Sequence, residues 1–150
     1  MKIAVASDHG GFKLKEEVKA HLLERGLEVL DLGTNSEDSV DYPAYGKACG
    51  EAVVGGQADV GIVVCGTGIG ISIAANKVKG VRCALCSEPC SAKLTREHND
   101  ANILAMGARI IGPVLAESIV DAFLTTQFCG DVRHQRRIDL VTKLEQDQTI

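Results

Sequence analysis

The chain has 150 residues, of which 45% are apolar, and a net charge of −4 at neutral pH. These values predict one domain, residues 1–150, that buries a core without disulfide bridges. The acidic balance and an aromatic content of 3% argue against a nucleic-acid surface, and no apolar run approaches a membrane span. The apolar start of the chain is too short for a signal peptide, so the six cysteines indicate free thiols in a cytoplasmic protein.

Short β-branched runs alternate with helical patterns along the chain, and glycine or proline marks most boundaries. We expect strands at residues 2–7, 28–32, 61–64, 82–86 and 102–106, and helices at 12–24, 41–54, 71–78, 89–97 and 114–126. This alternation predicts an α/β fold, a three-layer Rossmann-like domain with five parallel strands and helices on both faces. A ligand is then expected at the carboxyl ends of the strands.

A C-terminal arm, residues 129–150, follows the last expected helix and differs from the rest of the chain. Its pattern predicts an added helix to about residue 146, on which Arg133 and Arg137 lie four apart. The two guanidinium groups would share one face and could close on one phosphate. The alternative is a solvated basic face balanced by Glu145 and Asp147.

The stretch 60–76 carries the strongest chemical signal. A buried strand ends at Cys65, three glycines at positions 66, 68 and 70 break it, and a helix follows. Such a loop offers backbone N–H groups and a helix N-terminus to an anion such as a phosphate. The same field favours the thiolate of Cys65, which could act as a base or a nucleophile.

Other polar residues are expected to gather near this loop. Asp8 and His9 follow the first strand, and Arg109 follows the fifth. His98 stands in a polar segment between the fourth helix and the fifth strand, and we place it at the same rim as a candidate acid–base group. Each could instead be a turn residue, a helix cap or a surface charge.

Two other chemistries fit the glycine loop less well. A dinucleotide site would use Asp31 as its ribose-binding acid, but neither glycine cluster has the G-x-G-x-x-G spacing. A cysteine phosphatase needs an arginine six residues after Cys65, where the chain has Ile71. A metal site at Cys83, Cys86 and Cys90 is disfavoured, because strand residues three apart point to opposite faces and no second cluster completes the ligand set.

A third chemistry, proton transfer on a small phosphorylated sugar, accounts for all these groups. An aldose–ketose isomerase needs a base at carbon, an acid–base group that opens the sugar ring, and donors for the enediolate oxygen. It also needs a clamp for the phosphate, and it requires neither a metal nor an organic cofactor. A binding-only protein for phosphosugars or nucleotides is the alternative from another class, and it would survive loss of the Cys65 thiol.

Five separated motifs run through the chain. They are Asp8-His9-x-Gly11-Phe12, Gly33-Thr34 with Asp41-Tyr42-Pro43, Cys65-Gly66-Thr67-Gly68-x-Gly70-x-x-Ile73-Ala74-Ala75-Asn76-Lys77, His98-Asn99-Asp100-Ala101-Asn102 and Arg133-His134-x-x-Arg137. In type and order they resemble the type B ribose-5-phosphate isomerases of the ribose/galactose isomerase family. The resemblance covers essentially the whole chain.

The resemblance implies interconversion of ribose 5-phosphate and ribulose 5-phosphate in the pentose phosphate pathway. Cys65 would move the proton between C1 and C2, Thr67 and the loop amides would stabilise the enediolate, and His98, helped by Asp8, would open the ring. The implied sugar-binding residues are Gly66, Gly68, Ile69, Gly70 and Asn99, and the implied phosphate-binding residues are His9, Arg109, Arg133 and Arg137.

In this family the active site lies between two subunits. The resemblance therefore implies a homodimer or dimer of dimers, in which His98 or the arm reaches the partner's Cys65. Related isomerases of galactose 6-phosphate use two different subunits that divide or lose these motifs, whereas this chain has them all. Allose 6-phosphate is an alternative substrate, because Gly10 and Cys90 replace bulkier residues and could widen the site.

Overall fold

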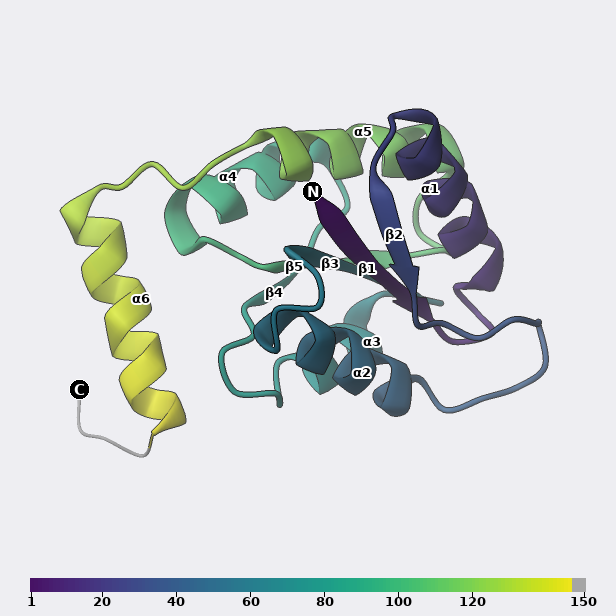
Figure 1. Cartoon of the computed structure of the whole chain (residues 1–150), viewed down its shortest axis with the longest axis horizontal. Helices are drawn as coiled ribbons and strands as arrows, with labels where there is room; N and C mark the ends of the chain where they lie inside the picture. The colour runs from purple at the N-terminus through teal and green to yellow at the C-terminus, as the bar shows by residue number, and fades with distance from the viewer. Residues whose placement is uncertain (147–150) are drawn as a thin grey trace.

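A computed structural model describes residues 1–146 and shows five strands in one sheet between two layers of helices (Figure 1). Strands and helices alternate up to α5, as the sequence predicts. In chain order the elements are β1 Lys2–Ser7, α1 Phe12–Glu24, β2 Glu28–Asp31, α2 Tyr42–Val54, β3 Val60–Cys65, α3 Ile69–Ala75, β4 Cys83–Leu85, α4 Pro89–Asn99, β5 Ile103–Gly107, α5 Pro113–Thr125 and α6 Val132–Glu145.

The sheet has the strand order β2-β1-β3-β5-β4, and every neighbouring pair is parallel. The chain moves outward from β1 to β2 on one side of the sheet. On the other side it passes from β3 to the edge strand β4 and then returns to β5, which lies between them. The helices that follow β1 and β3 lie on opposite faces of the sheet, and sheets of this kind bind ligands at the carboxyl edge between such helices, called the crevice below. Ser7 pairs with Val64, and Cys65 pairs with Gly107, so three strands end at this edge. The predicted α/β fold is confirmed.

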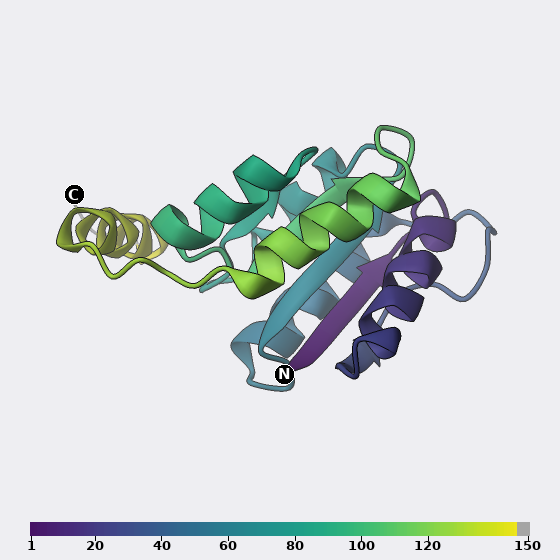
Figure 2. The ribbon, with the colours of Figure 1, turned by 90° about the horizontal axis from the view of Figure 1, so that it is seen from above.

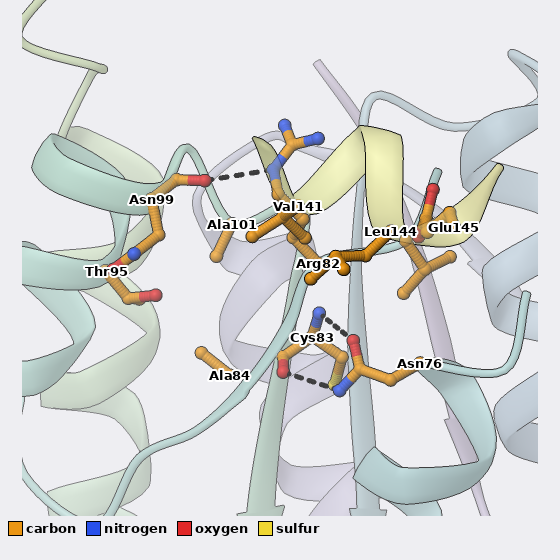
Figure 3. A pocket seen from close by; sticks show the side chains of 11 residues that line it. Asn76, Arg82, Cys83, Ala84, Thr95, Asn99, Ala101, Val141, Leu144 and Glu145 are labelled. Atoms are coloured by element: carbon orange, nitrogen blue, oxygen red, sulfur yellow. Dashed lines mark hydrogen bonds between the residues drawn. The ribbon is translucent and has the colours of Figure 1, made fainter. Parts of the chain in front are cut away.

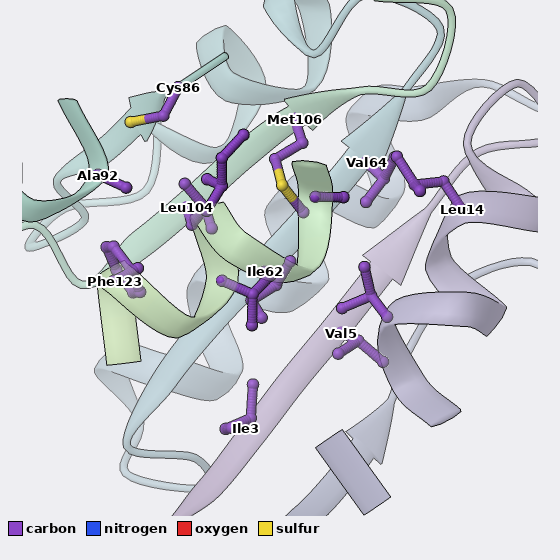
Figure 4. Close-up of a cluster of buried hydrophobic side chains, with 14 of the residues drawn as sticks. Ile3, Val5, Leu14, Ile62, Val64, Cys86, Ala92, Leu104, Met106 and Phe123 are labelled. Carbon is purple, nitrogen blue, oxygen red and sulfur yellow. The ribbon is translucent and has the colours of Figure 1, made fainter. Parts of the chain in front are cut away.

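The two faces of the sheet carry side chains of different size. On one face, Ile62 and Leu104 are fully buried beneath α1, α4 and α5, and Phe123 of α5 packs in the same cluster (Figure 4). Burying each one contributes about 1.5–3 kcal/mol to stability. The opposite face is lined largely by smaller residues and packs against α2 and α3. A Cβ atom at Gly61 would lie 2.6 Å from Cys49 Sγ, so α2 approaches the backbone of β3 closely.

The last helix, α6, stands apart from the three layers (Figures 1 and 2). Its described contacts within the chain are mainly with α4, through a narrow stripe that includes the buried residues His134 and Ile138. Val132 is 83% exposed and Leu144 is 55% exposed. The final part of the predicted arm, residues 147–150 with Asp147, lies outside the described residues.

Two helices end two or more residues away from their predicted ends. The third helix ends at Ala75 rather than near residue 78, because the next side chain, Asn76, turns to the edge strand β4. It accepts from Cys83 N at 2.8 Å and donates to Cys83 O at 2.9 Å, which covers part of the open sheet edge. The fourth helix runs on to Asn99, so His98 lies in its last turn and not in a loop. Within residues 1–146 no helix combines the length and apolarity that a bilayer crossing needs.

Candidate active site

Cys65 ends β3 at the crevice, and its side chain is 5% exposed. The backbone N–H of Gly68 donates a hydrogen bond to Cys65 Sγ at 3.1 Å, so the loop folds around the sulfur. Gly68 adopts a φ of +77°, and a Cβ atom there would lie 2.7 Å from the carbonyl carbon of Met106. Glycine is required at this position for both reasons.

The loop after β5 braces the Cys65 loop. Ala108 N donates to Cys65 O at 2.9 Å, and Arg109 N donates to Gly66 O at 2.9 Å. A Cβ atom at Gly66 would lie 3.4 Å from Arg109 Cζ, so the guanidinium group rests against the loop. The structure thus places the Arg109 side chain against the backbone of Gly66, the residue that follows Cys65.

The turn after β1 closes the other side of the crevice. Asp8 is 6% exposed, and its Oδ1 accepts from Gly11 N at 3.0 Å. A Cβ atom at Gly10 would lie 3.3 Å from Gly66 N, so this turn packs against the Cys65 loop, and a larger residue at position 10 would crowd it. His9 Nδ1 lies 3.1 Å from Val40 N, and the tautomer that accepts there keeps its Nε2–H free to donate.

The remaining loop residues lie at the mouth of the crevice. Thr67 and Ile69 are exposed, and Thr67 Oγ1 accepts from Ile69 N at 3.3 Å. A Cβ atom at Gly70 would lie 2.6 Å from Tyr42 Cζ, so the Tyr42 ring covers the first turn of α3. Tyr42 belongs to the motif around Pro43, but its position in the chain does not predict this contact.

His98 and Asn99 lie at the opposite edge of the sheet. The turn that follows them bonds to the starts of two strands: Asn102 O accepts from Gly61 N at 2.9 Å, and Asn102 N donates to Arg82 O at 3.1 Å. The prediction that His98 shares the rim of Cys65 within one chain is therefore wrong. A helix that follows a parallel strand must return to the amino edge before the next strand begins.

The basic residues of α6 lie with His98. The rings of His98 and His134 are stacked, with centroids 4.3 Å apart and planes 13° from parallel. Arg133 Nη2 lies 3.4 Å from His134 Nε2, and Arg133 and Arg137 are both exposed. Burial, followed by the charges of His98, Arg133 and Arg137, lowers the pKa of His134 and favours its neutral form. The sequence prediction missed His134, although positions 134 and 138 have the spacing of a helix face that contacts a neighbour.

Glu145 does not balance these arginines, contrary to one alternative for the arm. Its carboxylate accepts from Gly80 N at 3.0 Å, beside the start of β4. At the other end of the arm, Cys129 N donates to Glu97 O at 3.1 Å. The two bonds tether the described part of the arm on either side of its arginines. Arg133 and Arg137 are exposed, and Arg133 has a long 3.8 Å contact with the Asp131 carboxylate.

Comparison with known proteins shows to which family the chain belongs. A family model described as Ribose/Galactose Isomerase matches residues 3–141. Ribose-5-phosphate isomerase B of Escherichia coli is 55% identical over 145 residues, which are 97% of each chain. The chain belongs to the ribose/galactose isomerase family.

Solved structures of the family agree with the fold. Ribose-5-phosphate isomerase B of Clostridium thermocellum superposes with a TM-score of 0.96 at 52% identity, covering 98% of this chain and 99% of that one. The enzyme of Mycoplasma genitalium with bound ribulose-5-phosphate gives 0.92 at 40% identity, with coverages of 98% and 97%. As a member of this family, the chain is an aldose–ketose isomerase.

Three further thiols of this isomerase, those of Cys49, Cys83 and Cys86, lie largely shielded from water. Burial raises the pKa of Cys49 to about 12 and that of Cys86 to about 11, and it also raises the pKa of Cys83. These groups stay protonated at neutral pH. Within residues 1–146 no three His, Cys, Asp or Glu side chains gather as metal ligands would.

Proposed function

We propose that this isomerase interconverts D-ribose 5-phosphate and D-ribulose 5-phosphate, a step of the pentose phosphate pathway. The observation that carries the proposal is the Cys65 thiol, which accepts from the Gly68 amide at 3.1 Å, with the Arg109 guanidinium against the neighbouring Gly66. Base, enediolate donors and positive charge thus meet in one crevice. The names of the most similar relatives point to the same substrate.

The chemistry follows from these positions. The Cys65 thiolate takes the proton from C2 of the open aldose, and the C–H electron pair forms the C1–C2 double bond of the enediolate. Loop amides and the Thr67 hydroxyl stabilise the negative oxygen. Cys65 then returns the proton to C1 while a proton passes from O2 to O1. C1 is reduced and C2 is oxidised in the same molecule, so no redox cofactor takes part.

The remaining roles fall on groups at both edges of the sheet. Asp8 would assist ring opening, and the loop at positions 66 to 70 would bind the sugar beside Cys65. His98 would open the ring, and Asn99 would bind the sugar. The residues assigned to the phosphate are His9, Arg109, Arg133 and Arg137.

We propose that two copies of the chain complete each site. The five residues of β5 separate His98 from the edge that carries Cys65, and at about 3.3 Å per residue they span about 16 Å. A side chain cannot cross that distance. A twofold axis that sets the amino edge of one copy against the carboxyl edge of the other would create two equal sites in a dimer or dimer of dimers.

Exposed apolar surface supports this pairing. Ile69 and Ile73, next to the Cys65 loop, are 53% and 56% exposed. A cavity of about 540 Å³ beside β4 is lined by Asn99 and by Val141 and Leu144 of α6 (Figure 3). A self-complementary interface would cover both apolar surfaces at once.

A cytoplasmic location is part of the proposal. All six cysteines are unpaired in the structure, and unpaired thiols are typical of a reducing compartment.

Conversion of ribose 5-phosphate to ribulose 5-phosphate tests the function, with allose 6-phosphate run in parallel. We expect the wild type to prefer the pentose and Cys65→Ala to lose about 10³-fold in kcat while still binding it. Cys129→Ala removes an exposed thiol away from the crevice and should retain full activity. An inactive wild type, or an active Cys65→Ala variant, would contradict the proposal.

A further inference from the structure

The turn that follows His98 and Asn99 is held by a charged cluster with no role in the chemistry above. Asp100 ends α4 in the left-handed region, with φ 44° and ψ 46°. Among residues 1–146 it is the one non-glycine residue with a positive φ. This conformation is strained for a residue with a side chain and persists only where the surroundings enforce it.

Arg82 enforces it from the start of β4. Its Nε donates to Asn99 O at 2.9 Å (Figure 3) and to Asp100 O at 3.1 Å. Its Nη2 donates to Asp100 O at 2.8 Å and to Asp100 Oδ2 at 3.2 Å. One guanidinium group therefore fixes two successive carbonyls and the carboxylate of the turn.

Arg96 holds the other carboxylate oxygen. Its Nη1 donates to Asp100 Oδ1 at 3.1 Å and to Ala101 O at 2.5 Å. Its own position is fixed, because Cζ lies 5.3 Å from the centre of the Phe123 ring and Nε donates to Thr126 O at 3.4 Å. Asp100 is thus connected through Arg82 to the start of β4, and through Arg96 to the contact between α4 and α5.

We propose that Asp100, Arg82 and Arg96 are positioning residues that fix the orientation of His98 and Asn99 towards the sugar. Helix ends fray unless they are capped, and His98 and Asn99 occupy the last turn of α4. The stack on His134 orients the His98 ring, but it depends on a helix with few contacts to the rest of the chain. The cluster of Asp100, Arg82 and Arg96 holds the end of α4 rigid. This matters because a displacement of a catalytic group by about 1 Å can lower the rate about 100-fold.

This inference rests on the proposed ring opening by His98, and the substrate chemistry isolates that step. Ribose 5-phosphate closes its ring by attack of O4 on C1. Ribulose 5-phosphate stays open, because the O5 that would attack its C2 carbonyl is esterified. Exchange of a C1 proton of ribulose 5-phosphate with deuterated solvent therefore needs Cys65 but no ring opening.

The test compares Asp100→Ala with Asp100→Asn, which tolerates the left-handed backbone and keeps one acceptor oxygen. For Asp100→Ala we expect kcat on ribose 5-phosphate to fall about 10- to 100-fold, with C1 exchange at saturating ribulose 5-phosphate within about twofold of wild type. Displacement of Asn99 should appear separately, as a higher KM. Asp100→Asn should recover part of the loss. Lys93→Ala, which breaks an exposed 3.6 Å pair with Glu97 in the same helix, should change neither rate.

Thermal unfolding confirms that each variant is folded. If Asp100→Ala does not fold, Arg82→Lys replaces it, since it keeps the charge but loses the multiple bonds of the guanidinium, and the same separation of the two rates is expected. Unchanged ribose 5-phosphate turnover in the folded variants, or an equal loss of turnover and exchange, would overturn the positioning role. A wild type inactive on ribose 5-phosphate would instead refute the proposed function.

Discussion

Gly68 leaves no space for a side chain beside the Cys65 thiol, whereas Gly56 has a similar backbone in open surroundings. Their φ angles are +77° and +73°, but nothing lies within 4 Å of a Cβ atom at Gly56. We expect Gly68→Ala to lower the free energy of unfolding by about 3 kcal/mol, because strain and overlap with the Met106 backbone add. Gly56→Ala should cost about 1 kcal/mol.

Urea denaturation measures both losses, and turnover of ribose 5-phosphate measures the effect on the loop. Gly68→Ala should lose about 100-fold in kcat through displaced amides, while Gly56→Ala retains wild-type activity. Equal effects of the two substitutions would show that backbone strain alone, and not the packed loop, accounts for the glycine at position 68.

The residues of the Cys65 crevice could be predicted because each follows a strand end directly. Cys65, Asp8 and Arg109 all meet at the carboxyl edge, as a parallel sheet requires. Tyr42 and the cluster around Asp100 could not be predicted, since their contacts join segments far apart in sequence. Neither spacing nor residue type reveals which arginine binds which carbonyl.

The junction between α1 and β2 contains a lysine that is 1% exposed. Lys15 Nζ donates to the two carboxylate oxygens of Asp31 at 2.9 and 2.7 Å, and Lys19 Nζ donates to the same group at 2.7 Å. Burial alone would raise the pKa of Asp31, but the hydrogen bonds from Lys15, Lys19 and Gly33 N lower it overall. Asp31 therefore joins two elements and is not free to bind a ribose.

Lys15→Met should lower the free energy of unfolding by about 2 kcal/mol at pH 7, because Asp31 would lose its buried partner and keep only the half-buried Lys19. A carboxyl group whose pKa is lowered by folding stabilises the fold at pH values above its pKa in the unfolded chain. That contribution is lost as the pH falls through its pKa in the folded protein. The difference between Lys15→Met and wild type should therefore shrink near pH 3. Urea denaturation at both pH values measures it.

Lys13→Met provides the matched control on the same helix. Lys13 pairs with Glu37 at 3.0 Å, but its side chain is 76% exposed, so its loss should cost less than about 1 kcal/mol. A penalty for Lys13→Met as large as that for Lys15→Met would contradict the account of this junction.

On the scale of the whole molecule, alternation of strands and helices predicts the parallel sheet, but not which edge each helix end reaches. The sequence interpretation places His98 at the wrong edge, because it uses the nearness of His98 to β5 but not the fact that His98 precedes that strand. The arm was predicted as a helix, yet its contact with α4 through His134 depends on tertiary packing. The division of the candidate residues between two edges emerges only from the folded chain.

Mixing two inactive variants tests most directly the central claim, that one isomerase site is assembled from two copies. Cys65→Ala and His98→Asn, refolded together in equal amounts, should form half mixed dimers, each with one intact site of two. About a quarter of the wild-type turnover of ribose 5-phosphate is then expected. A mixture of Cys65→Ala with Arg109→Ala, both at the carboxyl edge, should gain nothing over its parents. Activity of the first mixture no higher than that of its separate variants would contradict the shared site.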